Sequence, residues 1–385
     1  MFPLFLTVFV DLVGFGIIIP FLPFFAESLK ASADEVTLLM TAFSLAQFVA
    51  APLWGRLSDR MGRKPVLVMT LFGLAASYVW LAFAQSLVEL FAARIFAGMM
   101  AGNVAVAQAA AADMTTPAER PKAMGMIGAA FGLGFLVGPA LGGVLANLHI
   151  GISIIAAPAF AAACLSTTAL LLAAVILKES HPEGAGAGHG KGRLESLRET
   201  FAKPGLRVFI VMAFLVPLAF AGVESTMALW TQAAFGWAAQ KNGYLFSFLG
   251  FIAVLTQGGL VGRLSKVTSE VVLVAWGAAA AVCGSLLVAL APVFWPAMVG
   301  FALIVLGVSL ATPAIASLIS RVAAASVQGT VMGASHASQA LARILGPAVA
   351  GGLFVSIGPS GPYLFGAALM AVLLALALGR RSKPI

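Results

Sequence analysis

Twelve long apolar stretches follow one another along the 385-residue chain, and little sequence lies outside them. Each is close to the roughly 20 residues that an α-helix needs to cross a bilayer. Only helices and closed barrels satisfy their backbone in hydrocarbon, and the stretches lack the alternation of barrel strands. We predict an all-α membrane protein with spans at about 4–25, 36–55, 66–86, 88–112, 122–147, 152–177, 208–233, 243–262, 271–291, 296–320, 329–355 and 361–379.

The composition excludes a soluble domain. Apolar residues make up 61% of the chain and charged residues 9%, against about 25% charged in soluble domains. The two cysteines, Cys164 and Cys283, lie inside spans and predict neither a disulfide nor a metal cluster. Because no phosphate-binding loop or nucleophile–His–acid grouping occurs, we expect no enzymatic activity, no ATP drive and no metal or cofactor.

The positive charges predict the orientation in the membrane. Of the 22 Lys and Arg residues, eighteen fall in one alternate set of loops and two in the other, while Arg94 and Arg343 fall inside spans. Cytoplasmic loops carry the excess of Lys and Arg, so both termini are expected on the cytoplasmic side. The membrane is expected to be the plasma (bacterial inner) membrane. No basic residue precedes the first apolar run and Asp11 lies inside it, which predicts a retained span rather than a signal peptide.

The two halves of the chain share motifs at a nearly constant offset. Gly55–Lys64 (GRLSDRMGRK) has a shorter copy at Gly262–Lys266, and Gly138–Gly143 matches Gly346–Gly352. Offsets of 207 or 208 residues indicate a parallel repeat of six spans, as many secondary transporters have. The predicted organisation is an N-terminal six-helix bundle at 1–177, a cytoplasmic linker at 178–207 with an interfacial helix near 193–203, and a C-terminal six-helix bundle at 208–385.

These motifs resemble those of the major facilitator superfamily, in particular the tetracycline-resistance branch of its drug:proton antiporters. Gly55–Lys64 resembles the superfamily signature between spans two and three, and Arg94–Gly98 resembles the span-four arginine motif. Gly132–Pro139 resembles the span-five antiporter motif, and Asp11–Pro23 resembles the span-one motif of that branch. The resemblance implies two pseudo-symmetric six-helix bundles, alternating access and proton antiport.

Two acids lie well inside apolar spans, Asp11 in span one and Glu224 in span seven. An ionisable group in hydrocarbon is expensive and usually functional, so both are predicted to carry protons; a fixed ion pair that locks helices is the alternative. Arg94 is predicted to reach Asp11 and hold it ionised, a role that the resemblance also implies. His336 and Arg343 of span eleven complete the predicted proton-coupling set.

Span eleven also carries Gln339, and the spacing of three and four residues places it on one helical face with His336 and Arg343. Arg343 is expected to attract an anionic substrate or to pair with Glu224. Apolar walls with a few polar groups suit amphipathic ligands, although such polar residues also join membrane helices. The predicted substrate cavity comprises Phe15, Ser44, Gln47, Asn103, Gln108, Ser225, Trp230, Gln257, Thr312 and Gln339.

Two motifs have a mechanical interpretation. The first is a cytoplasmic gate in which glycines allow close backbone approach, Asp59 caps a helix N-terminus, and Arg60 or Arg63 pairs with Asp113; a pure topology signal is the alternative. The second is an antiporter motif on span five, where small residues permit tight helix crossing, with generic packing as the alternative. The gate comprises Gly55, Asp59, Arg60, Gly62, Arg63 and Asp113, and the antiporter motif comprises Gly134, Gly138 and Pro139.

The sequence thus predicts a monomeric, proton-coupled exporter of small amphipathic or anionic compounds that works in the lipid bilayer without nucleic acid. An uptake symporter or organic-anion transporter of the same fold is the first alternative. A transport-inactive membrane receptor is the second, and the intramembrane acids argue against it.

Overall fold

The computed structural model describes residues 1–116, 119–146, 148, 150–180, 204–290, 293–322 and 328–381. Every regular element in these ranges is helical, and twelve helical stretches are long and apolar enough to cross a membrane. The predicted all-α fold with twelve spans is therefore confirmed. The predicted interfacial helix near 193–203 and most of the linker lie outside the described residues.

The helices follow the apolar runs closely, because each run supplies the length that the hydrocarbon demands. They are α1 (Phe2–Ile18), α2 (Leu22–Ser28), α3 (Ala33–Met61), α4 (Arg63–Phe83), α5 (Leu87–Met100), α6 (Asn103–Asp113), α7 (Arg120–Leu145), α8 (Ala156–Ile176), α10 (Pro204–Phe235), α11 (Ala239–Leu255), η1 (Thr256–Leu260), α12 (Val261–Leu264), α13 (Glu270–Leu290), α14 (Phe294–Val322), α15 (Gln328–Ile357) and α16 (Gly361–Arg381).

Three of the spans are interrupted. Span one breaks between α1 and α2 at Pro20, which has no N–H to donate. Span four breaks between α5 and α6 at Ala101 and Gly102, and span eight passes through the π-helical turn η1. Irregular backbone at membrane depth is tolerated only where protein or water satisfies it. The breaks in spans one and four therefore need hydrogen bonds from other groups, whereas the π-helical turn η1 keeps backbone bonds of its own.

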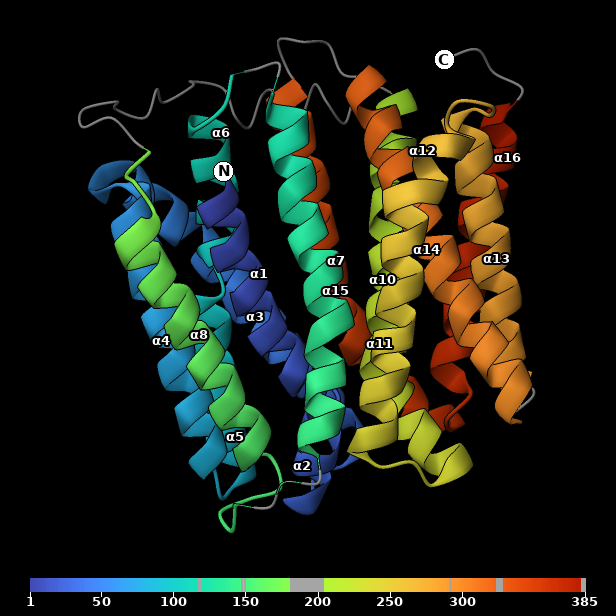
Figure 1. Cartoon of the computed structure of the whole chain (residues 1–385). Coiled ribbons are helices and arrows are strands. Elements are labelled where there is room, and N and C mark those ends of the chain that lie inside the picture. The colour runs from blue at the N-terminus through green and yellow to red at the C-terminus, as the bar shows by residue number, and fades with distance from the viewer. Residues whose placement is uncertain are drawn as a thin grey trace. The chain divides into compact units, whose positions relative to one another are not determined.

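The described residues form two compact units, the first comprising Met1–Gly188 and Trp237–Phe251 and the second comprising His189–Gly236 and Ile252–Ile385. In the first unit α1 packs against α7 and α8, and α4 packs against α8 (Figure 1). Its buried core includes Leu4, Val8 and Leu12 of α1. Three residues of this core, Val8, Leu67 and Ala107, line a small cavity beside Asp11.

Glycines set the closeness of the α1–α7 crossing. A Cβ added at Gly138 would lie 2.6 Å from the carbonyl oxygen of Val13 and 2.8 Å from Gly16 Cα. At Gly134 the added Cβ would lie 2.7 Å from the Cβ of Leu12. Backbone atoms of the two helices are thus nearly in contact, which is the packing that small residues permit in lipid.

The second unit repeats this arrangement between α10 and α15. A Cβ added at Gly346 would lie 2.8 Å from the carbonyl oxygen of Leu218. Gly346 is the repeat partner of Gly138, so the Gly-Pro motif brings two helices together in each unit. The unit's aromatic core centres on Trp230, whose ring lies 5.5 Å from Phe301 and 5.8 Å from Tyr363 between centroids.

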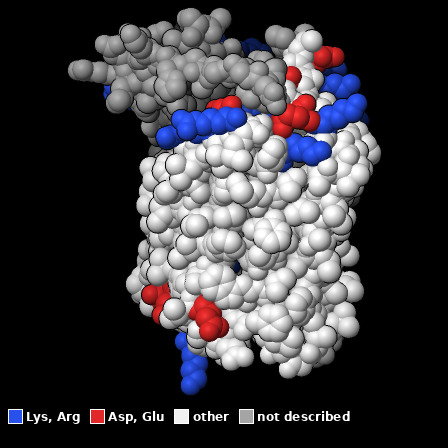
Figure 2. Space-filling model, turned by 90° about the vertical axis from the view of Figure 1, so that its left-hand side faces the viewer, with Lys and Arg blue, Asp and Glu red and all other residues white. Residues whose placement is uncertain are grey.

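On the outer face drawn in Figure 2, charged side chains are concentrated near the two ends of the helices. On the face in Figure 2, Lys, Arg, Asp and Glu gather at the two ends, and the surface between them is almost entirely white. Most of the visible Lys and Arg residues lie at one of these ends. An apolar band between two charged ends is the pattern expected of a surface that faces lipid.

Candidate transport site

The predicted site residues fall in both units, and each group is described within its own unit. In the first unit Asp11 lies on α1 with only 6% of its surface exposed. Its two carboxylate oxygens accept hydrogen bonds from Asn103 Nδ2 at 2.8 Å and from Ser166 Oγ at 2.9 Å. Neutral donors from α6 and α8 therefore hold the acid, and no ion pair of Asp11 occurs among the described side chains.

Arg94 on α5 is also buried, with 2% exposure. Its guanidinium lies 4.3 Å from the centre of the Phe43 ring, a cation–π arrangement. Within the described part of the chain its Nε has no hydrogen-bond partner, and the expected direct contact with Asp11 does not form. Tyr78 of α4 interacts electrostatically with both Asp11 and Arg94, so the three side chains share one buried neighbourhood.

A small cavity adjoins the acid. Its volume is about 10 Å³, and Asp11, Thr7 and Asn103 supply its polar lining. That is room for about one water molecule with polar partners.

The break in span four is held from α3. Gln47 Nε2 donates to the carbonyl oxygen of Ala101 at 2.9 Å, and Trp54 Nε1 donates to that of Met99 at 2.5 Å. Gln47, expected in a substrate cavity, is therefore committed to backbone in this structure, and Asn103 is committed to Asp11. The other predicted cavity residues of this unit, Phe15, Ser44 and Gln108, are half-buried, and Phe15 packs on Phe43 and Phe135.

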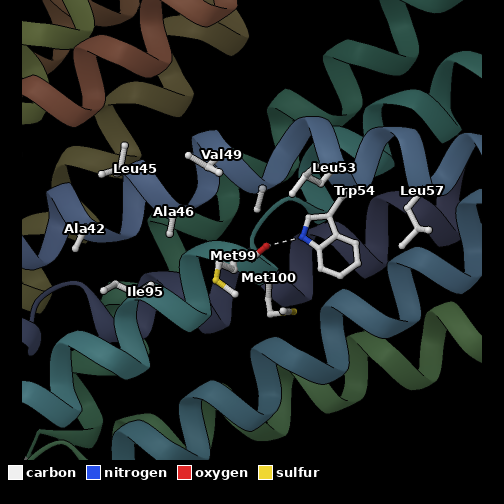
Figure 3. Close-up of a pocket in the computed structure, with 11 residues that line it drawn as sticks. Ala42, Leu45, Ala46, Val49, Leu53, Trp54, Leu57, Ile95, Met99 and Met100 are labelled. Carbon is white, nitrogen blue, oxygen red and sulfur yellow. Dashed lines mark hydrogen bonds between the residues drawn. The ribbon is translucent and has the colours of Figure 1, made fainter.

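An apolar groove of about 510 Å³ lies between α3 and α5 (Figure 3). Its volume is in the usual range for small-molecule pockets. Leu45, Val49 and Leu53 line one wall and Ile95 and Met99 line the other, while Trp54 and Leu57 lie at one end. None of the residues predicted for the substrate cavity lines this groove.

In the second unit Glu224 on α10 is half-buried, while Arg343 and His336 on α15 are exposed. Arg343 interacts electrostatically with both Glu224 and His336. No ion pair joins Glu224 to Arg343 among the described residues. The structure therefore brings these three predicted residues into one neighbourhood without locking them together.

The remaining predicted residues of this unit are mostly occupied by local contacts. Ser225 Oγ donates to the carbonyl oxygen of Gly222 at 2.9 Å, and Trp230 is fully buried in the aromatic core. Thr312 Oγ1 donates to the carbonyl oxygen of Val308 at 2.8 Å, Gln339 Nε2 to Ser335 Oγ at 3.2 Å, and Gln257 Nε2 to Ser309 Oγ at 3.5 Å.

The predicted gate centres on Arg63. Its guanidinium contacts Asp59 Oδ1 at 2.6 Å and Asp113 Oδ2 at 2.8 Å, so it links the ends of α3, α4 and α6. The cap expected of Asp59 is supplied by Glu179, whose carboxylate accepts from the N–H groups of Arg63 and Lys64 at 2.8 and 3.1 Å. An anion at a helix N-terminus is favourable, and Glu179 follows α8 directly.

The two glycines and the second arginine of the gate differ in their surroundings. Gly62 has a φ of +95°, and a Cβ there would lie 2.5 Å from Glu179 Oε2, so this position requires glycine. A Cβ at Gly55 would meet nothing within 4 Å. Arg60 is exposed and makes no ion pair within the described ranges, so the pairing with Asp113 belongs to Arg63.

Replacing Arg63 with Ala is expected to lower the thermal stability of the protein. The change removes the contacts of Arg63 with Asp59 and Asp113, and hydrogen bonds to charged groups contribute about 1.5–3 kcal/mol each. Arg60→Ala removes an equal charge three residues away and is expected to change stability by less than about 0.5 kcal/mol. Thermal unfolding of the purified proteins measures both, and equal midpoints for the two variants would contradict the central place of Arg63.

Sequence reasoning missed Ser166, Tyr78 and Glu179. Ser166 and Tyr78 are single polar residues in apolar spans. Such residues most often bond to their own helix, and only the tertiary contacts distinguish these two.

The groove between α3 and α5 was also missed, although the sequence carries a signal for it. Leu45, Val49, Leu53 and Leu57 recur every four residues on one face of α3.

Comparisons with known proteins agree with this architecture. The sequence profile of the Major Facilitator Superfamily matches residues 4–347. The chain is 31% identical to the class C tetracycline resistance protein of Escherichia coli, over 98% of this chain and 96% of that protein. It is 26% identical to multidrug resistance protein 1 of Bacillus subtilis strain 168, over 97% of this chain and 94% of that protein.

Among solved structures, the human organic anion transporter MFSD10 (TETRAN) superposes with a TM-score of 0.74 and 26% identity, over 97% of this chain and 98% of that one. The chain belongs to the Major Facilitator Superfamily. It is a multi-pass membrane transporter related to tetracycline and multidrug resistance proteins, and the resemblance found in the sequence is confirmed.

Proposed function

We propose that this transporter is a proton-coupled exporter of small amphipathic compounds and works by alternating access. The supporting observation is Asp11, a buried acid in the middle of a span that neutral donors hold and no cation pairs with among the described residues. A carboxylate without a cation is expensive in hydrocarbon, and such groups mark proton relays. A proton removes that charge, so its arrival and departure change the energy of the surrounding helices.

Two further features support export of amphipathic compounds. The groove between α3 and α5 is apolar and large enough for a small organic molecule. The relatives include tetracycline and multidrug resistance proteins.

The proposal gives each group of residues a role. Arg94 and Tyr78 adjust the proton affinity of Asp11. Glu224, together with Arg343 and His336, forms a second titrating group, and the Arg63 cluster acts as the cytoplasmic gate.

The proposal includes an orientation. The excess of Lys and Arg in alternate loops supports cytoplasmic termini and a cytoplasmic linker between bundles at 1–177 and 208–385. The proposal also places the protein in a bacterial inner membrane, as a monomer. Protons enter from outside through Asp11, and substrate leaves in the opposite direction.

Reconstituted proteoliposomes test the proposal. With an imposed pH gradient, substrate is expected to move against the proton flow, and a pH-sensitive dye is expected to record proton movement only when substrate is present. Candidate substrates come from a growth screen of an exporter-deficient bacterium against diverse toxic compounds. Substrate accumulation in the same direction as the protons would instead establish symport.

An uptake symporter or organic-anion carrier is the second candidate. It is favoured by the exposed Arg343, which lies in the electrostatic neighbourhood of Glu224, and by the likeness to an organic anion transporter. An exposed guanidinium can bind a carboxylate substrate with two hydrogen bonds. In the same proteoliposomes, this candidate requires that an anionic substrate is transported by the wild type and that this transport is lost in Arg343→Gln.

A further inference from the structure

The break in span four replaces helical hydrogen bonds with bonds to side chains. In a continuous helix the carbonyl of Ala101 would accept from the N–H of Ala105. Here the Ala105 N–H donates to Gly102 at 3.2 Å, and Gln47 donates to Ala101. Trp54 likewise donates to the carbonyl of Met99 just before the break (Figure 3). The backbone at the break is therefore held by two side chains of α3.

The helices on the two sides of the break are anchored differently. α5 packs closely along α3, and a Cβ at Gly98 would collide with the carbonyl oxygen of Phe43. α6 shares its contacts among α1, α3, α4 and α7, and its far end is joined to Arg63 through Asp113. No single helix holds α6 as closely as α3 holds α5, so α6 is the arm that can turn about the break when the Arg63–Asp113 pair opens.

The moving arm is tied to the acid at its first residue. Asn103 begins α6 and donates to Asp11 Oδ2. A hydrogen bond to a carboxylate is about twice as strong as one between neutral groups. Whichever oxygen of Asp11 takes a proton, Asn103 loses a charged acceptor. The Ser166 hydroxyl can rotate to accept from the new O–H, whereas the NH₂ group of Asn103 cannot accept.

We propose that Ala101 and Gly102 form a hinge, and that the angle between α5 and α6 at this hinge depends on whether Asp11 is protonated. Asn103 is the positioning residue that connects Asp11 to the hinge. The charged acid holds α6 against α1 through Asn103. Protonation weakens that bond, and α6 turns about the break within the limits that Gln47 and Trp54 allow. The inference rests on the proposed function, because it requires that Asp11 gains and loses a proton.

Few other titratable groups face Asp11. Tyr78 of α4 and Arg94 of α5 are the buried ones in its neighbourhood. The remaining charged residues of α4, α5, α6 and α7 lie at or near the helix ends, and α8 carries no Asp, Glu, Lys, Arg or His. A pH-dependent change at the hinge can therefore be assigned by replacing a small number of side chains.

The apolar groove extends along α3 past the residues that hold the hinge. Trp54, Met99 and Met100 line it, and Trp54 is one of the two side chains that hold the break. An amphipathic compound seated in the groove contacts the hinge directly. The proton site at Asp11 and the groove thus both contact the break at Ala101 and Gly102.

Pulsed EPR on the full-length protein measures the hinge. In a background with both cysteines replaced by Ala, spin labels are attached at Met61→Cys and Met114→Cys, which are exposed positions at the ends of α3 and α6. The eleven residues of α6 span about 16 Å, so a rotation of about 10° moves its end by about 3 Å. Infrared difference spectra of unlabelled protein, with Asp11→Asn as reference, record the Asp11 carboxyl band.

The label distance is expected to shift by about 3 Å on acidification, with the same midpoint as the carboxyl band. Asp11→Asn is expected to hold the acidic distance at every pH. Asn103→Leu is expected to abolish the shift while the carboxyl band still titrates. Gln47→Leu, which removes a donor on the other side of the hinge, is expected to bring the distance at high pH toward the acidic value.

Ser77→Ala is the matched control, because Ser77 is buried and its hydroxyl bonds only to the carbonyl of Leu74. It is expected to leave the shift unchanged. A constant distance while the Asp11 band titrates would overturn the hinge and leave the proposed function standing. A missing Asp11 band would instead overturn the proposed function and the hinge with it.

Discussion

Replacing Asp11 with Asn will reduce proton-driven transport to the level of protein-free liposomes. Asn has nearly the shape of Asp but cannot gain or lose a proton. Its amide keeps one acceptor for the donors Asn103 and Ser166, which both point at the acid. The variant also removes a charge that is expensive in hydrocarbon, so the protein is expected to fold. Proteoliposomes with an imposed pH gradient measure the effect.

Two controls separate coupling from general damage. Exchange of labelled for unlabelled substrate across the membrane needs no net proton movement and is expected to persist in Asp11→Asn. Asp34→Asn removes an acid from the first turn of α3 and is expected to keep gradient-driven transport. If Asp11→Asn accumulated substrate at the wild-type rate, Asp11 would have no part in coupling.

The spans and the depth of Asp11 could be predicted because they depend on local sequence. Hydropathy over a window of about 20 residues sets where a helix crosses, and ten residues at 1.5 Å each put Asp11 near the midplane. Glycine spacing likewise indicated the face of α7 that meets α1. The break in span four left only Gly102 as a signal, because no proline interrupts this apolar run.

The partners of the charged groups could not be predicted in the same way. Opposite charges in neighbouring spans suggested that Arg94 pairs with Asp11, but the rotation of each helix decides which side chains meet. Here the shorter Asn103 and Ser166 reach the acid, and Ser166 is 155 residues away in sequence. Glu179 at the start of α4 is a similar case, with a separation of 116 residues from Arg63.

Gly138→Val is expected to abolish transport and to lower the yield of folded protein. Even a Cβ at this position would lie 2.6 Å from the carbonyl oxygen of Val13 and 2.8 Å from Gly16 Cα, and neither backbone atom can rotate away. Added volume in a packed interior costs about 1–3 kcal/mol, and more where backbone must move. The α1–α7 crossing would widen and displace Asp11 from its donors. Size-exclusion profiles, thermal unfolding and transport measure these effects.

Gly128→Val supplies the matched control, because Gly128 lies on the same helix and a Cβ there meets nothing within 4 Å. It is expected to leave stability and transport near wild type. Gly346→Val tests the repeat, since its Cβ would lie 2.8 Å from the carbonyl oxygen of Leu218 in the second unit, and a comparable loss is expected. Full transport in Gly138→Val would mean that the α1–α7 crossing tolerates separation and that this motif does not set the geometry around Asp11.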